Sequence, residues 1–268
     1  MKARLLHSLP NAKSRHSQLT TLGSKWTKTK ILMRSPKLHQ YVPDTMLFTF
    51  DDLQLMLDKH QMVYVKPVKG SSGNGVIKVV KKNTTYSYHV GMEPRNFPTY
   101  KEMFRSLIRR KYDREYIVQQ GIRLLTYDER IFDIRIMVQK NEKSEWETTG
   151  YIGRLAHPKK IVTNFHNSGK PMTLEQLMSP YLQDEKKAKF IESLRELGHQ
   201  MAVEFHTRFP AFKEIGIDLG LDSSLKPWII EVNTRPDAYI FNQLKDKQMF
   251  RRVISLKRWN GLIRARTK

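Results

Sequence analysis

Two short runs late in the chain carry acidic and amide side chains at a spacing that could bind a cation. They are GIDLGL at 216–221 and PWIIEVN at 227–233, joined by DSSLK. Side chains alternate across a strand, so a hairpin that turns within DSSLK places Asp218 opposite Glu231. Like charges in that position destabilise a hairpin unless a proton or a cation is shared between them. With the amide oxygen of Asn233 they form an all-oxygen set that suits Mg²⁺ or Mn²⁺. The alternative is that each acid pairs with its own lysine on an exposed face.

A glycine-rich loop follows Lys66 in the run KPVKGSSGNGVI, residues 66–77. Glycines let backbone N–H groups turn toward a ligand, which suits a phosphate chain, and Lys66 and Lys69 add positive charge. The loop is not a Walker loop, because no Lys-Ser or Lys-Thr pair follows its last glycine. A loose hairpin is the alternative. The candidate loop residues are Gly70, Ser71, Ser72, Gly73 and Gly75.

Two further runs place polar side chains at alternate positions. In IFDIRIMV, Asp133 and Arg135 point to one face of a strand while the apolar residues point to the other, which is typical of either a cleft wall or a surface ion pair. In VTNFHNSGK, Asn164 and His166 stand two residues apart. A single histidine of this kind is more often a hydrogen-bonded surface residue than a catalyst.

The elements that must position these residues follow from periodicity and turn signals. Residues 184–208 carry the clearest helical period, with Phe190, Leu194, Leu197, Met201 and Phe205 on one stripe. Because most neighbouring strands lack a helix between them, the order of elements predicts an α+β fold with mainly antiparallel sheets. Helices are expected at 51–60, 98–111 and 184–208, and strands at 62–68, 76–81, 84–90, 115–119, 130–140, 145–155, 213–221 and 227–232.

Composition narrows the class of protein. The 268 residues are 39% hydrophobic and include no cysteine, which excludes disulfide scaffolds and thiolate sites. The formal net charge is +22, and most of it lies at the ends: residues 1–43 hold nine Lys or Arg and no acid. Basic ends suggest an acidic partner, which is a nucleic acid, an anionic polymer or an acidic protein surface, or else a solvated surface. No apolar stretch reaches the roughly 20 residues that span a bilayer, so we expect an intracellular protein.

Taken together and in order, the motifs resemble the ATP-grasp superfamily. They are Lys66 with its glycine loop, VQQGI at 118–122, DIR at 133–135, NFH at 164–166, GID at 216–218 and EVNTRP at 231–236. The DIR, NFH and EVN pieces are similar to the glutamate ligases that act on ribosomal protein tails. The lead-in GSKWTKTKILMRSPKLHQYVPDT and the ending WIIEVNTRPD look closer still to the YheC/YheD family of spore-associated ATP-grasp proteins.

The resemblance implies an ATP site between two small α+β lobes. Lys66 and a lysine of the lead-in, Lys28 or alternatively Lys30, would hold the α- and β-phosphates, with the glycine loop folded over them. Main-chain groups near the end of a strand would bind the adenine. That stretch comprises Gln119, Gln120, Gly121 and Ile122.

The metal and substrate positions are implied in the same way. Asp218, Glu231 and Asn233 would hold two Mg²⁺ ions, the set that the hairpin geometry also selects. Groups that would face the transferred phosphoryl group or the acyl-phosphate are Arg135, Arg154 and Asn164, and groups that would meet the substrate are His166 and Arg235.

The resemblance also divides the chain. We expect a basic tail at 1–22, an ATP-grasp domain at 23–245 with lobes at about 45–120 and 121–245, and a basic tail at 246–268. Compared with the ATP-grasp enzymes that it resembles, we expect this chain to lack their usual N-terminal α/β domain of about 100 residues. A second departure is Thr-Arg-Pro-Asp after Asn233, where many relatives have a small residue, proline and glycine.

Three functions follow as hypotheses. The first is an ATP- and Mg²⁺-dependent carboxylate–amine ligase acting on an acidic substrate. The second is a non-catalytic ATP-binding structural module that is spore-associated. The third is a binder of nucleic acid or another anionic polymer in which the ATP-grasp body is only a scaffold. A cytoplasmic location is expected, with spore association as the alternative.

Overall fold

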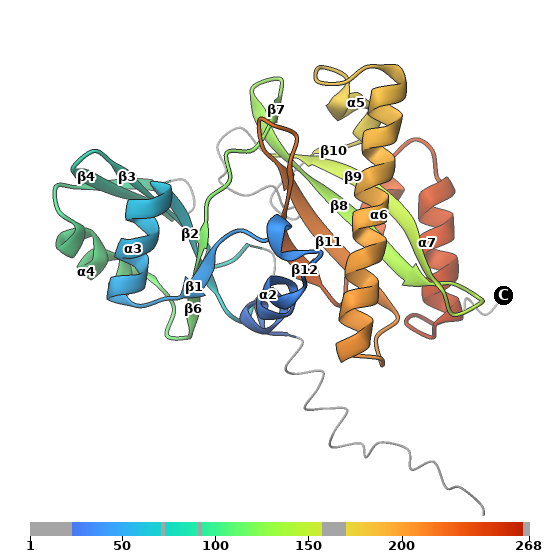
Figure 1. Ribbon diagram of the computed structural model, residues 1–268, viewed down its shortest axis with the longest axis horizontal. Coiled ribbons are helices and arrows are strands. Elements are labelled where there is room, and N and C mark those ends of the chain that lie inside the picture. The colour runs from blue at the N-terminus through green and yellow to red at the C-terminus, as the bar shows by residue number, and fades with distance from the viewer. Residues whose placement is uncertain (1–22, 71–72, 91–92, 157–169, 265–268) are drawn as a thin grey trace, which may run out of the picture.

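The computed structural model describes residues 23–70, 73–90, 93–156 and 170–264. These residues form two sheets, one in a smaller and one in a larger lobe, which lie side by side (Figure 1). Helices and antiparallel strands are mixed in both lobes, so the predicted α+β class is confirmed. Among the described residues, no helix combines the length and the apolar character needed to cross a membrane.

The smaller lobe is one antiparallel sheet in the order β1-β6-β2-β3-β4-β5, with two helices on one face. Thr49 and Thr99 cap these helices by accepting a hydrogen bond from a backbone N–H in the first turn. The elements are β1 (Thr45–Leu47), α3 (Phe50–His60), β2 (Met62–Pro67), β3 (Ile77–Lys82), β4 (Thr85–Val90), β5 (Glu93–Phe97), α4 (Tyr100–Arg110) and β6 (Tyr116–Gln120).

The larger lobe contains the sheet β10-β9-β8-β11-β12, to which β7 adds through β8. Helix α6 crosses one face of this sheet and α7 covers the other (Figure 1). The elements are β7 (Thr126–Tyr127), β8 (Arg130–Lys140), β9 (Trp146–Leu155), β10 (Lys170–Met172), α5 (Leu174–Met178), α6 (Asp184–Arg208), β11 (Glu214–Leu221), β12 (Pro227–Asn233), η3 (Tyr239–Gln243) and α7 (Gln248–Trp259).

The apolar patterns predict the packing of the larger lobe well. Ile134, Ile136 and Val138 of β8 face the core under α6, as expected. Four of the five predicted stripe residues of α6 are buried, and Phe190 is partly buried against the same core. The close approach of α6 to β8 requires glycine at one point, because a Cβ on Gly198 would lie 2.9 Å from Ile136.

The lead-in forms a helix that the sequence analysis does not predict, α2 (Lys25–Arg34), followed by η1 (His39–Tyr41). Ser24 caps α2 by accepting a hydrogen bond from the Thr27 N–H. Ile31 and Leu32 pack into the core of the larger lobe. The chain therefore enters the larger lobe first, crosses to build the smaller lobe, and then returns.

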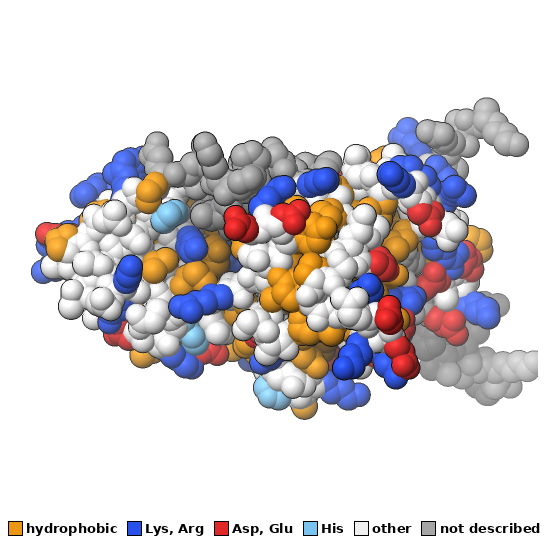
Figure 2. All heavy atoms as spheres, turned by 90° about the horizontal axis from the view of Figure 1, so that it is seen from above, with side chains coloured by type: hydrophobic (Ala, Val, Ile, Leu, Met, Phe, Trp, Pro, Cys, Tyr) orange, Lys and Arg blue, Asp and Glu red, His pale blue; other side chains and the backbone are white. Residues whose placement is uncertain are grey.

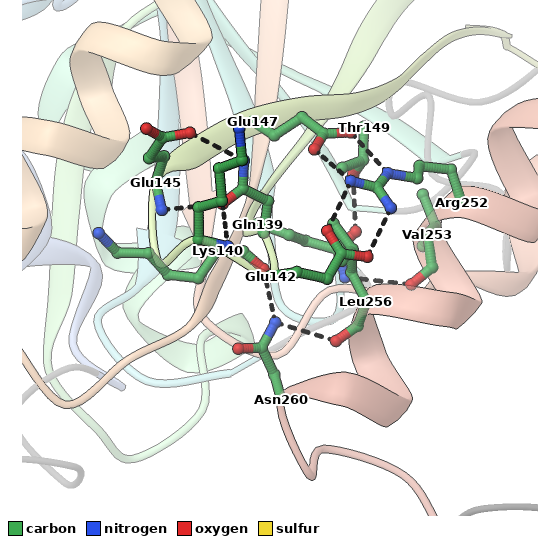
Figure 3. A network of polar contacts seen from close by, with 12 residues as sticks. Gln139, Lys140, Glu142, Glu145, Glu147, Thr149, Arg252, Val253, Leu256 and Asn260 are labelled. Atoms are coloured by element: carbon green, nitrogen blue, oxygen red, sulfur yellow. Dashed lines mark hydrogen bonds and ion pairs between the residues drawn. The ribbon is translucent and has the colours of Figure 1, made fainter.

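The expected basic tail at 246–268 contains a packed helix. On α7, Val253 and Ile254 join the core on the second face of the sheet, together with Met137 and Ile152. Polar contacts tie the helix to β8, β9 and the turn between them: Arg252 donates to Glu142 and Glu147, Gln139 donates to the Val253 carbonyl, and Asn260 donates to the Lys140 carbonyl (Figure 3). Residues 248–259 are therefore part of the folded body.

Candidate functional site

A cleft between the lobes collects residues from both sheets. It encloses about 870 Å³, part of which is open solvent. Its walls mix apolar side chains with a few charged ones. The lining residues are Lys25, Pro43, Tyr64, Lys66, Pro67, Gly70, Gly73, Asn74, Val76, Gln119, Gln120, Ile122, Leu124, Ile131, Asp133, Asp218, Ile230 and Glu231.

The glycine loop connects β2 to β3 at the mouth of this cleft. Gly70, Gly73 and Gly75 all have positive φ angles, of 146°, 74° and 75°, which other L-residues rarely adopt. Gly75 also lies against the Tyr112 ring, because a Cβ there would be 2.7 Å from Tyr112 Cε2. The glycines are thus required by the backbone path of the loop. Ser71 and Ser72 lie outside the described residues.

Two buried lysines flank the loop side of the cleft. Lys66, on β2, donates to Gln119 Oε1, and Lys28, on α2, donates to the Val232 carbonyl. Burial lowers the pKa of each lysine to about 8, and Glu231 acts in the opposite direction. Lys66 lines the main cleft, whereas Lys28 lines a small adjoining cavity that shares Lys66.

Lys25 is a site residue that the sequence analysis misses. Its Nζ lies 2.9 Å from Glu231 Oε1 and donates to the Gly70 carbonyl at 2.7 Å. Its backbone N–H donates to the Val68 carbonyl at 2.8 Å. Lys25 therefore joins the glycine loop of the smaller lobe to β12 of the larger lobe. The serine cap that starts α2 was the available signal, because it places Lys25 in the first turn.

The predicted pairing of the two acids is confirmed, since Asp218 and Glu231 are cross-strand partners on β11 and β12. The cations that face them are side chains of the protein. Asp218 is buried and accepts two hydrogen bonds from Arg135, and Arg154 lies 3.1 Å away. Glu231 pairs with Lys25. Of the expected alternative, a separate lysine for each acid on an exposed face, only the lysine partner of Glu231 is found. Glu231 is half-buried, and both carboxylates line the cleft.

The charged cluster beneath the cleft is held by strand register. Arg135 on β8 is the cross-strand neighbour of Asp218, and Arg154 on β9 is that of Asp133. Burial acts to raise the pKa of Asp218, but attraction to Arg135 and Arg154 lowers it below its usual value. Both arginines are thus engaged by carboxylates next to the cleft. Of the two expected interpretations of this strand face, a cleft wall or a surface ion pair, Asp133 fits the first, because it is buried and lines the cleft.

The oxygen ligands at the hairpin, from Asp218, Glu231 and Asn233, could hold a cation only if a bound phosphate and waters completed its shell. Asn233 lies close to Asp218, with its Nδ2 3.4 Å from Asp218 Oδ2. Within the described residues, no cluster of three or more His, Cys, Asp or Glu side chains could hold a metal. Two carboxylates and an amide are the set that Mg²⁺ uses when phosphates and waters complete its shell.

The residues expected to bind the adenine, 119–122, lie at the end of β6 and just after it. Gln119, Gln120 and Ile122 line the cleft, and the Gly121 N–H donates to the Met62 carbonyl. A Cβ on Gly121 would lie 2.7 Å from Met62 Cε, so this position needs glycine. Apolar walls that could cover a planar ring come from both lobes, among them Tyr64, Val76, Leu124 and Ile230.

The remaining predicted residues lie elsewhere. Arg235 is exposed and lines neither cavity, and Lys30 is exposed on α2, where its Nζ lies 5.4 Å from the centre of the Trp26 ring. Of the two lead-in lysines, only Lys28 is buried next to the cleft. Asn164 and His166 fall outside the described residues.

Comparison with known proteins agrees with this architecture. Residues 19–257 match the YheC/D-like ATP-grasp family. The chain is 23% identical over 220 residues to the endospore coat-associated protein YheC of Bacillus subtilis (strain 168), which covers 80% of this chain and 60% of that protein. It is also 23% identical over 229 residues to the endospore coat-associated protein YheD of the same organism, which covers 83% of this chain and 50% of that protein. The chain thus spans only part of the length of both relatives. Because the family match extends over most of its residues, this chain belongs to the YheC/D-like ATP-grasp family.

Proposed function

We propose that this chain binds ATP with Mg²⁺ in the cleft and uses it to join a carboxylate to an amine. The observation that carries the proposal is that one cleft gathers the glycine loop, Lys66, the end of β6 and the pair Asp218 and Glu231. These elements come from distant parts of the chain and from both lobes. Family membership supports the ATP-dependent, ligase-type chemistry.

The proposed nucleotide position follows from charge. Lys66 and Lys28 are buried cations whose contacts described above are to a side-chain amide and a carbonyl, and their lowered pKa values reflect the cost of that burial. A phosphate chain beside them would compensate this cost and hold both lysines protonated. The apolar walls beyond Gln120 would then receive the adenine.

The divalent cation fits at Glu231 and Asp218. Bound with ATP, it would neutralise the charge that develops on the phosphates during transfer. Glu231, about one fifth exposed, would exchange Lys25 for the cation, and Lys25 would be free to turn toward a phosphate. Asp218 would keep its arginines, which hold its carboxylate charged and fixed in orientation.

The ligase step needs a carboxylate to attack the γ-phosphoryl group and an amine to displace the resulting phosphate. Arg135 and Arg154 lie beside the metal-binding acids, and Asn164 is proposed to complete this region. Most of the rate enhancement would come from positioning and from charge neutralisation. The products are an amide, ADP and phosphate.

The direct test is a titration of ATP with and without Mg²⁺, monitored by thermal unfolding. A ligand of the folded state raises the midpoint by mass action, so Mg²⁺ and ATP together should stabilise most. Release of ADP and phosphate when candidate acids and amines are offered then tests turnover. No shift at millimolar ATP would contradict the proposal.

Glu231→Gln is expected to remove the Mg²⁺-dependent part of the ATP-induced shift while the protein stays folded. The charge-matched control is Glu192→Gln, which removes a more exposed ion pair with Arg195 on α6 and should leave the shift unchanged. Equal behaviour of the two variants would remove Glu231 from the metal site.

A second candidate is a structural module in which ATP is only a stabilising ligand. It is favoured by the names of both relatives, which are endospore coat-associated proteins. Association of this chain with the spore coat, and of its basic ends with an acidic polymer or protein, belongs to the same proposal. An ATP-induced shift without ADP release under any substrate pair would select this candidate.

A further inference from the structure

The outer face of α4 carries cations in a regular row. Lys101, Arg105 and Arg109 follow one another at intervals of four residues, so they lie on one side of the helix with about 6 Å between successive residues. All three are exposed, and Ile108, 40% exposed, lies between them. Arg114 follows in the turn after the helix. We call these residues, Lys101, Arg105, Arg109 and Arg114, the α4 basic face.

Repulsion within this row opposes helix stability, although Arg109 lies in the last turn, where the helix dipole favours a cation. Like charges at four-residue spacing repel, and Lys101 sits in the first turn, where the helix dipole disfavours a cation. No residue of the α4 basic face forms a salt bridge to a carboxylate within the described part of the chain. The residues outside the described ranges contain no Asp or Glu, so they hold no acidic segment that could cover it.

The α4 basic face runs toward the cleft. After α4 the chain turns at Tyr112, whose ring contacts the Gly75 turn of the glycine loop. The Arg114 guanidinium lies 4.9 Å from the centre of the same ring. Figure 1 shows α4 at the outer end of the smaller lobe, and on the face seen in Figure 2 most acidic side chains gather over the larger lobe. An anionic chain bound along α4 would therefore end beside the glycine loop.

We propose that the α4 basic face docks an acidic polypeptide segment. Arginine clusters recognise acidic motifs through bidentate contacts to carboxylates, and the spacing along α4 offers several such contacts. Ile108 offers an apolar contact between the cations, which suits the side chains of a peptide. A single-stranded nucleic acid would need aromatic rings for base stacking. Tyr112, which is half exposed, has part of its ring against Arg114 and the Gly75 turn.

This docking proposal rests on the proposed ligase function at one point only, which is that the docked segment is the acid substrate. A glutamate or aspartate side chain of that segment would be the carboxylate delivered to the cleft. Docking itself requires no nucleotide. It is measured without ATP, so its failure and a failure of ATP binding are separate results.

The test measures binding of a fluorescent oligoglutamate of about ten residues, long enough to follow α4 in extended form. Fluorescence anisotropy at low salt compares the whole chain with Lys101→Ala/Arg105→Ala/Arg109→Ala, since alanine preserves the helix. The matched control is Lys186→Ala/Arg208→Ala/Lys213→Ala, which removes the same charge from exposed sites on the larger lobe. An oligouridylate of equal length is the second probe.

The oligoglutamate dissociation constant should rise about tenfold in the α4 variant, which corresponds to three surface charge contacts, and less than twofold in the control. Circular dichroism checks that both variants keep the wild-type helix content. Equal weakening in the two variants, or no binding by the wild-type chain, would overturn the proposal. Tighter binding of the oligouridylate that is lost with the α4 cations would overturn it as well, and would assign the face to nucleic acid.

Discussion

At Asp218, burial and ion pairing act on the same carboxylate in opposite directions. Burial would raise its pKa, but Arg135 and Arg154 lower the pKa to about 2. An unfolded aspartate titrates near 3.9. The ion pairs therefore contribute stability that is fully present above about pH 4 and is lost as the pH falls toward the folded pKa.

Asp218→Asn is expected to lower the free energy of unfolding by about 3–5 kcal/mol at pH 7, because it leaves two buried guanidinium groups with one fewer counter-charge. The difference from wild type should shrink as the pH is lowered from 4 toward 2. Urea titrations across this range measure it. Asp58→Asn, which breaks an exposed pair with Lys81, should cost at most about 1 kcal/mol. A pH-independent difference for Asp218→Asn would contradict the assigned charge state.

The two lead-in lysines offer a comparison on one helix. Lys28 is buried beside the cleft and Lys30 is exposed, although they are two residues apart. Lys28→Met should weaken ATP binding at least tenfold, since a hydrogen bond to a charged group contributes about 1.5–3 kcal/mol. Lys30→Met should change it less than twofold. Isothermal titration calorimetry measures the ATP affinity of both variants. A larger loss of affinity in Lys30→Met would assign the phosphate-binding role to Lys30.

Residue roles could be predicted only where the geometry is local. The pairing of Asp218 with Glu231 follows from counting outward from a short hairpin. The pairing of Asp218 with Arg135 depends on the register of β8 against β11 and joins two residues that are 83 positions apart in the sequence. No periodicity in the sequence fixes that register, so the neutralisation of Asp218 by arginine could not be read from it.

Among the elements, the glycine loop depends on both backbone conformation and space. Gly75→Ala would place a Cβ at a φ of 75° and against the Tyr112 ring. We expect a loss of about 1–3 kcal/mol in stability and weaker ATP binding. Thermal unfolding and calorimetry measure the two effects.

The double variant Gly75→Ala/Tyr112→Ala separates the two causes. Removing the ring relieves the contact but leaves the backbone strain, so stability relative to Tyr112→Ala should recover only in part. Complete recovery would mean that the positive φ carries no cost at this position, and the explanation by backbone strain would then be wrong.

Element boundaries were predicted closely where charge and apolar periodicity agree, as for α3, α6 and the β8–β9 hairpin. Helices α2 and α7 were missed because both are rich in lysine and arginine, which hides a narrow apolar stripe. On α7 that stripe is buried by Met137 and Ile152, residues of distant strands. Burial of this kind depends on tertiary contacts that a local pattern does not contain.

For the molecule as a whole, each lobe has its own hydrophobic core and the cleft lies between them. Binding of Mg²⁺ and ATP should therefore slow amide hydrogen exchange in both lobes together, at residues 68–76 and in β11 and β12. Amides of α7, which lies behind the sheet, serve as the internal control. Hydrogen exchange with mass spectrometry measures this, and protection confined to one lobe would contradict binding across the cleft.

The path of the chain through the lobes has a consequence for synthesis. Ile31 and Leu32 of α2 belong to a core that includes Ile229 and Val232 of β12, which the ribosome makes some two hundred residues later. All elements of the smaller lobe lie between residues 45 and 120, so that lobe can fold while translation continues. Until β12 has been made, the apolar side of α2 stays uncovered and the cleft between the lobes is incomplete.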